Sequence, residues 1–570
     1  MRMKELSVAR RWMMIALSFI LCSLSFSVAH AQSMNISVDS VGKLEKQLPD
    51  DIRFKVAELK VSGPLNGADL KLLSQIVTRT KVNKKVVGEC LVTSIDLSEA
   101  VIKEGKEGMK TENNTLPNGL FSGATSLVKA LLPKNILNIS RNCFDNCSSL
   151  AEMPIPETVI TIGSNAFSDC PRLSTFDLPN VLTEIEHDAF EGCISLTAIE
   201  IPESVVELGD NAFKGCKSLS KVVINGKIKE IGISTFQDCR FLEEITIPES
   251  VQKIGTNAFR ECKSLKNISL PDNLEGIGTN AFRDCTSLEQ IELERVKKIG
   301  SGAFQNCVSL KSASLQGSLD EIDTDVFADC SSMSSITLPS SIKKIGSRSF
   351  QNCKSLEAID LPIALTKIND HVFENCTSLK YILIPTTVKD MGSSIFEGCT
   401  ALDSVDIKGF VEEIENEAFR SCHSLRSITL PVSVKKIGSR AFDGCSVLKY
   451  VSLPVTLQVI GNGAFQKCPM LEHITVPAGV REIGSDAFRE CSALATADLS
   501  VSLKEIGGSA FAKCVSLREV NVKAPLPPKI SKSTFKDVVL GVCKFYIPKC
   551  CKNMYSQDKQ WNKIPQLVVR

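Results

Sequence analysis

Residues 242–263, LEEITIPESVQKIGTNAFRECK, contain every feature that decides the fold. The opening LEEITI has the pattern L-x-x-I-x-I, in which apolar and polar residues alternate at the end, as in a strand with one buried face. Pro248 lacks an N–H donor, so it ends the strand. Ala258, Phe259 and Cys262 then lie at positions i, i+1 and i+4, which predicts a short helical turn with one apolar face.

This pattern recurs every 23 residues along most of the chain. Cysteines keep that spacing from Cys147 to Cys514, with a single step of 22 residues between Cys285 and Cys307. A phenylalanine stands three residues before each of these cysteines, which we call the cysteine ladder. Self-similarity at this period indicates a stack of coils. One coil cannot bury enough apolar surface to offset the entropy of ordering 23 residues, so stability requires neighbours on both sides.

The consensus L-x-x-I-x-I/L-P-x-x-V-x-x-I-G-x-x-A-F-x-x-C-x-S-L resembles the leucine-rich repeat of the BspA type. Its opening matches the general leucine-rich signature, and the late cysteine after A-F separates this class from other leucine-rich repeats. Phe121 and Phe535 extend the array beyond the ladder. The resemblance implies an α/β-type repeat solenoid of about 18 coils of 23 residues, with a parallel sheet on one face and short helical turns on another. It also implies a secreted or surface protein of host-associated bacteria or some protists, a class in which some members are adhesins.

The N-terminal residues predict export. Basic residues, an apolar run over 12–28 and the small residues of Ala29-His30-Ala31 predict a signal peptide over 1–31, cleaved before Gln32. An uncleaved membrane anchor is the alternative, and the serines within the short apolar run disfavour it. No second apolar span follows, so we expect no transmembrane segment after cleavage and a location at the cell surface, outside the cell or in the periplasm.

Three further regions follow. Residues 32–89 do not repeat; they predict a short helix, a strand and a second helix, and they resemble the N-terminal cap found before such repeats in Bacteroidetes proteins. The solenoid is expected over 90–523. Residues 524–570 are expected to form a degenerate last repeat and a C-terminal cap, in which Tyr555 and Trp561 cover the final coil.

The chain contains 23 cysteines, which in an exported protein raises the question of disulfides. Stacked coils point every ladder cysteine the same way, so bridges would need distortion at each step, and we predict buried free thiols. Zinc requires paired ligands such as C-x-x-C or nearby histidines, which the ladder lacks, so we predict no metal and no cofactor. Cys90, Cys143, Cys543, Cys550 and Cys551 lie outside the ladder, and pairing of Cys543 with Cys550 or Cys551 stays open.

Composition and motifs argue against an enzyme and against a nucleic-acid partner. The 66 basic and 65 acidic residues give a net charge of +1, which attracts neither nucleic acid nor an anionic membrane. The sequence has no G-x-S-x-G, no phosphate-binding glycine loop and no H-E-x-x-H. His187 and His371 occupy variable positions, for which we predict solvated surface.

The outward residues of the predicted strands vary most, and most of them are small or polar. Tyr381, Leu383, Tyr450 and His473 break this pattern within five repeats, and Asp360 and Asp406 are predicted on the strands either side of Tyr381. Aromatic residues on a rigid exposed sheet are typical anchors of a binding patch. The alternative, chance variation of a solvated surface, stays open. The candidate ligand-binding residues are Asp360, Tyr381, Leu383, Asp406, Tyr450 and His473.

We therefore expect a non-enzymatic exported binding or adhesion protein whose repeat surface contacts a protein or glycan, with host extracellular matrix among the candidate partners. The alternative is a structural envelope spacer or a self-assembling component.

Overall fold

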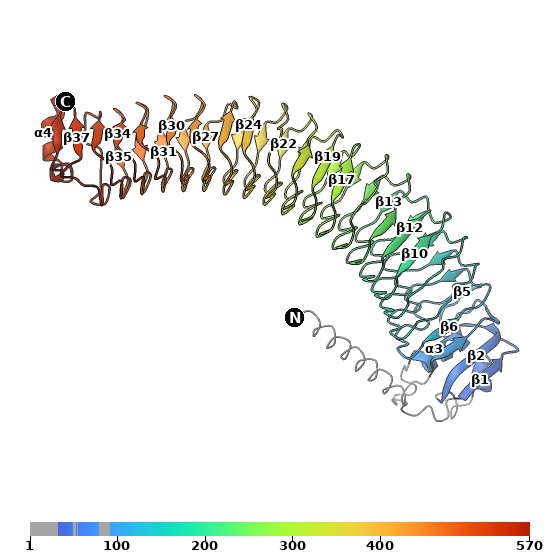
Figure 1. Cartoon of the computed structure of the whole chain (residues 1–570). Helices are drawn as coiled ribbons and strands as arrows, with labels where there is room; N and C mark the ends of the chain where they lie inside the picture. Colours follow the sequence, from blue (N-terminus) through green and yellow to red (C-terminus); the bar gives the residue numbers. More distant parts are fainter. Residues whose placement is uncertain (1–31, 49–52, 54, 79–91) are drawn as a thin grey trace, which may run out of the picture. The chain divides into compact units, whose positions relative to one another are not determined.

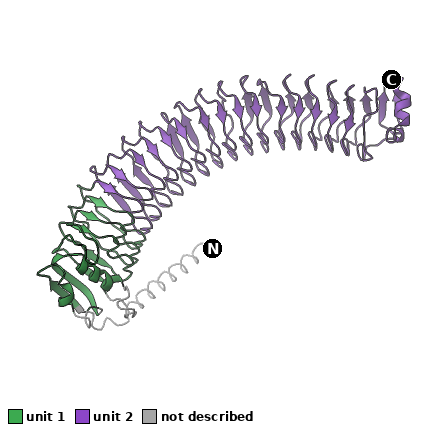
Figure 2. Cartoon of the chain, turned by 180° about the vertical axis from the view of Figure 1, so that it is seen from behind, with its two compact units in different colours: residues 1–182 green, residues 183–570 purple. Residues whose placement is uncertain are grey.

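The structure is a computed structural model that describes residues 32–48, 53, 55–78 and 92–570. The chain divides into two compact units, residues 1–182 and 183–570, which Figure 2 shows in different colours. The expected signal peptide over 1–31 and Cys90 lie outside the described residues.

Unit 1 begins with the predicted helix, strand and helix, preceded by a strand that the sequence did not reveal. The elements are β1 (Gln32–Ser37), α2 (Leu44–Gln47), β2 (Val56–Leu65), α3 (Gly67–Thr78), β3 (Ser94–Asp96), β4 (Ala100–Ile102), β5 (Thr115–Leu116), β6 (Lys129–Leu131), β7 (Asn138–Ile139) and β8 (Thr161–Ile162). Strand β1 pairs with β2, and β2 pairs with both β3 and β4, all in parallel. The buried carboxylate of Asp69 accepts the backbone N–H groups of Gly42 (2.7 Å), Leu44 (3.0 Å) and Asn66 (3.1 Å), which fixes both helices.

Unit 2 contains two rows of parallel strands, stacked side by side (Figure 1). The first row follows the L-x-x-I-x-I pattern and forms what we call the strand face: β10 (Ala198–Ile201), β12 (Lys221–Ile224), β14 (Glu244–Thr246), β17 (Gln290–Leu293), β19 (Ser312–Leu315), β21 (Ser335–Thr337), β24 (Tyr381–Ile384), β26 (Ser404–Ile407), β28 (Ser427–Thr429), β30 (Tyr450–Ser452), β32 (His473–Thr475), β34 (Thr496–Leu499), β36 (Glu519–Val522), β37 (Lys544–Ile547) and β38 (Leu567–Val569).

A second row of two-residue strands ends at the isoleucine of each I-G pair or its equivalent. These strands are β9 (Glu184–Ile185), β11 (Glu207–Leu208), β13 (Glu230–Ile231), β15 (Lys253–Ile254), β16 (Gly276–Ile277), β18 (Lys298–Ile299), β20 (Glu321–Ile322), β22 (Lys344–Ile345), β23 (Lys367–Ile368), β25 (Asp390–Met391), β27 (Glu413–Ile414), β29 (Lys436–Ile437), β31 (Val459–Ile460), β33 (Glu482–Ile483) and β35 (Glu505–Ile506). The leucine-rich solenoid with a parallel sheet is confirmed, and the second row adds to it a feature that the sequence did not predict.

The predicted helical turns consist of successive single turns rather than a continuous α-helix. Cys262 donates its N–H to the carbonyl of Phe259 (3.1 Å), a spacing of three residues. Asn257 and Glu261, on either side of that phenylalanine, have φ of 56° and 64°. Positive φ interrupts a right-handed helix. The freed backbone groups bond across coils instead, as where Phe259 donates to Ala281 (2.8 Å).

The glycine of the I-G pair is required by a close approach between coils. A Cβ on Gly255 would lie 2.7 Å from the backbone carbonyl carbon of Gly232, and one on Gly278 would lie 2.6 Å from that of Gly255. Neither glycine has positive φ. Glycine therefore occurs at this position because it has no side chain, and not because the backbone requires a positive φ.

The phenylalanines form one continuous buried column in unit 2. From Phe190 to Phe535 successive rings stand 5.1 to 5.7 Å apart, with interplanar angles of 22° or less. Offset stacking is a favourable geometry for such pairs. Each ring therefore contacts the rings of both neighbouring coils, which couples the stability of one coil to the next.

The ladder cysteines are buried free thiols that bond to the preceding coil. The Cys262 thiol donates to the carbonyl of Phe236 at 3.2 Å, and the same contact recurs in successive coils. Burial raises the pKa of the Cys445 and Cys514 thiols to about 12. A protonated, buried thiol is a small apolar side chain that still satisfies one carbonyl.

Aromatic side chains pack at the C-terminal end of unit 2. After β37 come the short helices η1 (Lys549–Cys551), α4 (Lys552–Gln557) and η2 (Trp561–Lys563). Tyr555 and Trp561 are completely buried and donate to the carbonyls of Ala524 (2.8 Å) and Pro528 (2.7 Å). Strand β38 then pairs in parallel with β37. Cys543 is a free thiol, and the Cys550 and Cys551 sulfur atoms lie 3.1 Å apart.

Replacing Phe259 by alanine should lower the free energy of unfolding by about 3–5 kcal/mol, because the ring is fully buried between those of Phe236 and Phe282. Coupling acts mainly between neighbouring coils, so limited proteolysis should first cut near this repeat. Phe241→Ala is the control, because Phe241 is 60% exposed. Equal stability and equal cleavage of the two variants would contradict the Phe column as the source of the coupling.

The ladder thiols should resist a thiol reagent in the folded protein and react after denaturation without prior reduction. The reason is that they are buried and that a raised pKa removes the reactive thiolate. Mass spectrometry of the labelled protein measures this. Labelling of the ladder that requires a reductant would instead show disulfides.

Candidate binding surface

The predicted candidate residues all fall in unit 2, and all of them except Asp360 lie on its strand face. Tyr381 and Leu383 lie on β24, Asp406 on β26, Tyr450 on β30 and His473 on β32. Asp360 is exposed, but its segment is not a strand, so the prediction that it lies on a neighbouring strand is wrong. The predicted alternation of outward and inward residues is seen on β24 and β32, where Ile382, Ile384 and Ile474 are buried beside the exposed candidates.

Tyr381, Leu383 and Asp406 form one group because β24 and β26 pair in register. Tyr381 lies opposite Ser404, and Leu383 lies opposite Asp406. Tyr381 is 46% exposed and Leu383 is 43% exposed. The half-buried Asp406 carboxylate is 3.1 Å from the Lys408 amine, so this charge is already paired. The group therefore offers an aromatic ring and an aliphatic side chain beside a neutralised ion pair.

Tyr450 and His473 form a second group further along the strand face. Tyr450 is 56% exposed, and the Lys449 amine lies 5.5 Å from its ring centroid and 3.1 Å from Glu472. This ion pair raises the pKa of Lys449, with the hydrogen bond to Glu472 as the largest cause. The His473 ring bonds to the hydroxyl groups of Thr496 and Thr475.

The two groups are separated by a stretch of small side chains. Tyr450 lies opposite Ser427, and Tyr381 opposite Ser404, so two serines stand between the tyrosines on successive coils. Three coil spacings of about 4.8 Å place the two tyrosines roughly 14 Å apart. The structure thus brings the candidates onto one face but not into one cluster, and a ligand that contacts both groups must be larger than a single sugar or amino acid.

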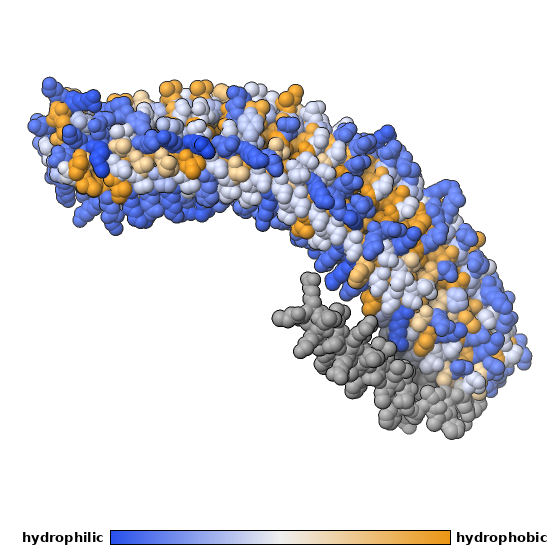
Figure 3. Space-filling view, in the orientation of Figure 1, coloured by the Kyte–Doolittle hydropathy of each residue, from blue (hydrophilic) through white to orange (hydrophobic). Residues whose placement is uncertain are grey.

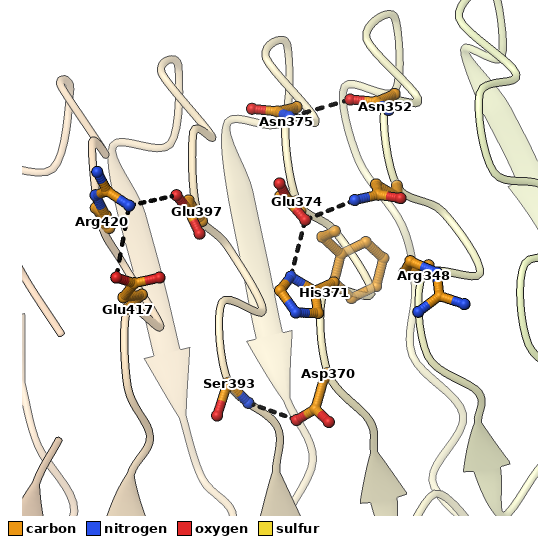
Figure 4. A network of polar contacts seen from close by, with 12 residues as sticks. Arg348, Asn352, Asp370, His371, Glu374, Asn375, Ser393, Glu397, Glu417 and Arg420 are labelled. Carbon is orange, nitrogen blue, oxygen red and sulfur yellow. Dashed lines mark hydrogen bonds and ion pairs between the residues drawn. The ribbon is translucent and has the colours of Figure 1, made fainter. Parts of the chain in front are cut away.

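His371 belongs to a different surface, the one formed by the turns (Figure 4). Its Nδ1 lies 2.8 Å from Glu374 Oε2, which also accepts a hydrogen bond from the Gln351 side chain at 2.6 Å. On the next coils Arg420 donates to Glu397 at 3.1 Å. These contacts continue from coil to coil as a polar ladder. The prediction of a surface position agrees with this arrangement, in which the imidazole is held by a carboxylate.

One surface feature escaped prediction, although the sequence contains its signal. At the second position after the last apolar residue of the L-x-x-I-x-I pattern, coils early in unit 2 carry Glu203, Glu249 and Asp272. From residue 363 onward no coil carries a charge there until the end of the regular array. We call this set the apolar column; it consists of Ile363, Thr386, Phe410 (one residue later in its coil), Val432, Val455, Ala478 and Val501.

The apolar column contains the most exposed large hydrophobic side chains among the described residues. Val455 is 81% exposed, Ile363 79% and Val432 73%. Figure 3 shows hydrophobic side chains projecting from the upper edge of unit 2, above the strands labelled β24 to β30 in Figure 1. Single exposed hydrophobic residues are ordinary, whereas several of them at the same position of nearby coils are typical of an interaction surface.

Other classes of site receive no support from the described parts of the chain. No group of three or more His, Cys, Asp or Glu side chains there is placed to hold a metal ion. No helix in the same residues combines the length and the apolar character needed to cross a membrane.

The family model for the BspA type leucine rich repeat region matches residues 114–243, 229–355, 297–426 and 412–540. Together these matches cover most of the chain. The chain belongs to the BspA-type leucine-rich repeat family. Leucine-rich repeat proteins of this type generally act by binding and are generally not enzymes. No curated protein matches the chain.

Among solved structures, a leucine-rich repeat protein from Bacteroides ovatus ATCC 8483 is 25% identical, with a TM-score of 0.36, over 78% of this chain and 90% of that one. A leucine-rich repeat protein of T. pallidum is 33% identical, with a TM-score of 0.27, over 28% of this chain and 77% of that one. A leucine-rich cell surface protein from Faecalibacterium prausnitzii A2-165 is 20% identical, with a TM-score of 0.24, over 70% of this chain and 84% of that one.

Proposed function

We propose that this chain is an exported, non-enzymatic binding protein that contacts another protein through the strand face between β24 and β32. The observation that carries this proposal is the pair of exposed tyrosines, Tyr381 and Tyr450, held on strands with Leu383 between them in sequence. Family membership supports binding as the activity. The predicted signal peptide supports a location at the cell surface, outside the cell or in the periplasm.

The chemistry of the face favours a protein partner over a small charged ligand. Asp406 and Lys449 are already engaged by neighbouring charges, and His473 is held by threonines. The groups left free are aromatic and aliphatic, and they are separated by roughly three coil spacings. Aromatic side chains fixed on strands lose little entropy on binding, so they suit the centre of a protein interface. Proteins of a host extracellular matrix are therefore the first partners to test, with glycans beside them.

Tyr381→Ala and Tyr450→Ala should each weaken partner binding by more than about 1 kcal/mol and change the free energy of unfolding by less than about 0.5 kcal/mol. Binding is measured on a panel of immobilised matrix proteins and glycans, and unfolding by denaturant titration. Glu244→Ala is the matched control, because Glu244 occupies the same outward position on β14.

A loss of stability without a loss of binding would show that the tyrosines pack in the interior and that the strand face between β24 and β32 is not the binding surface. Equal loss of binding in the Glu244 variant would show a general surface effect rather than an anchor.

Self-association is a second candidate function, and the apolar column favours it. A second copy of the chain, laid antiparallel, brings the two columns together with Val432 opposite its own counterpart and Ile363 opposite Val501. Such an isologous contact is the commonest way in which identical chains associate. Seven coils give a column about 30 Å long, which together with its flanking side chains can bury the roughly 800 Å² per partner of a standard interface.

Val432→Glu combined with Val455→Glu should abolish concentration-dependent association, because the charges introduced at position 432 would face each other across the two-fold axis and the charge at position 455 would face Phe410 of the second copy. The fold should tolerate both changes, since Glu203 and Glu249 occupy the equivalent position in other coils. Analytical ultracentrifugation over a range of concentrations measures the mass. Val206→Glu, at a residue that is 60% exposed outside the column, is the control. A wild-type chain that stays monomeric at every concentration would exclude this function.

A further inference from the structure

An open pocket of about 570 Å³ lies on the second row of strands in unit 2, where it extends from β13 to β18. It lies around Gly276, where an added Cβ would have no described atom within 4 Å apart from those of its chain neighbours. Lys253 and Lys298 occupy the position of Gly276 on β15 and β18, which both pair with β16 in register. Gly278, the next outward residue of the same coil, also lacks a side chain. The volume falls within the range of pockets that hold small ligands.

Elsewhere in unit 2, side chains of one coil bond to the backbone of the next coil beside the I-G pair. Asp210 Oδ1 accepts the N–H of Ile233, the residue that follows the glycine of its coil, at 2.6 Å. Asp370, Asn416 and Asn462 accept the equivalent N–H of the next coil at 2.7 to 2.8 Å, and Figure 4 shows the bond made by Asp370. This N–H is therefore a donor that a carboxylate oxygen or an amide oxygen satisfies.

The glycine of the I-G pair leaves space for the accepting oxygen. A Cβ on Gly232 would lie 2.5 Å from Asp210 Oδ1, and the corresponding distances in two later coils are 2.9 and 2.7 Å. The oxygen therefore lies beside the glycine, on the side where other residues carry a Cβ. Gly255 and Gly278 line the pocket, so a ligand oxygen can take the equivalent place beside either of them.

The coils of the pocket lack the accepting side chain. Ile233 and Thr256 occupy the position that Asp210 has one coil earlier, and neither is an acidic or an amide residue. Among the residues that the structure describes, the N–H groups of Thr256 and Thr279 have no hydrogen-bond partner. Both threonines line the pocket, Thr256 half-buried and Thr279 exposed. Surface donors of this kind are hydrated, and a ligand oxygen that replaces the water bonds to them directly.

The charges around these donors favour a negatively charged oxygen. The side chains of Lys253, Lys297 and Lys298 line the pocket together with those of Glu230 and Glu275. The Lys297 amine is 2.8 Å from Glu275, and Glu230 lies opposite Lys253 on the paired strand, so the excess of one amine falls on the side of Lys298. A hydrogen bond from a backbone N–H to a carboxylate is charge-assisted and stronger than one to a neutral oxygen.

We propose that this pocket binds a carboxylate, carried either by a small organic acid or by the acidic side chains of a peptide. The carboxylate oxygens accept the N–H groups of Thr256 and Thr279, as Asp210 Oδ1 accepts the N–H of the next coil, and Lys253 and Lys298 attract the charge. The pocket shares no residue with the strand face between β24 and β32, so this assignment does not depend on the proposed function.

Isothermal titration of the full chain at low ionic strength tests the pocket, because salt screens exposed charges. The probes are succinate, its neutral analogue succinamide, an acetylated tri-aspartate amide and the matching tri-asparagine peptide. Succinate, the tri-aspartate peptide or both should bind at least tenfold more tightly than their neutral analogues. The tighter of the two acids identifies the source of the carboxylate. Equal binding of the neutral analogues, or no binding of either acid, would overturn the proposal.

Ile233→Asn combined with Thr256→Asn should weaken binding of the acid at least tenfold without changing the net charge. The new side-chain oxygens would accept the N–H groups of residues 256 and 279, as Asn416 and Asn462 accept in their coils. Ser347→Asn is the matched control, because Ser347 follows the glycine of a coil outside the pocket, and it should leave the affinity unchanged.

Lys253→Gln combined with Lys298→Gln should weaken binding several-fold and provides a second test that leaves the backbone donors untouched. Denaturant titration checks that each variant keeps the stability of the wild-type chain. Unaltered affinity in a folded double-asparagine variant would show that the ligand does not use these N–H groups, and the proposal would fail.

Discussion

Every coil must return to the same register after 23 residues, and the rest of the structure depends on that closure. The carbonyl of Phe236 illustrates the constraint, because it accepts the N–H of Cys239 within its own coil and the thiol of Cys262 from the next. A coil with extra residues would shift its phenylalanine ring, its cysteine thiol and its backbone hydrogen bonds out of register with the next coil. The step from Cys285 to Cys307 obeys the rule with 22 residues, since the Cys307 thiol still reaches the carbonyl of Phe282 at 3.2 Å. A coil can therefore differ in length only where its phenylalanine and cysteine still align with those of the neighbouring coils.

The same constraint leaves the outward positions free to vary. Glu249 and Val455 occupy equivalent places after their strands, and the fold accommodates both. Packing therefore does not require Tyr450, which is 56% exposed, whereas its neighbour Val451 is half-buried. In a solenoid of this kind the interior specifies the fold and the exterior specifies the partner, so binding can change without loss of stability.

The period of the sequence was enough to predict the fold, because one buried pattern repeated many times leaves few alternatives. The outward phase of Tyr381 and Tyr450 was predictable for the same reason, since strand residues alternate strictly. Other features could not be predicted from the sequence. Strand β1 lies outside the array, and the close approach at Gly255 depends on the distance between coils. Strand β38 lies where the spacing breaks, because Lys544 pairs with Glu519 after 25 residues and β38 itself has no repeat pattern.

The distribution of charge within unit 2 separates a scaffold-like part from a part suited to binding. Early strands present Glu200, Lys221 and Glu244 to solvent, and such charges keep a sheet soluble and discourage pairing with other chains. From about residue 360 onward the apolar column replaces acidic residues, and Tyr381, Leu383 and Tyr450 stand on the strand face beside it. Packing does not require these exposed apolar groups and solubility disfavours them, so they support the proposal that a partner covers this surface.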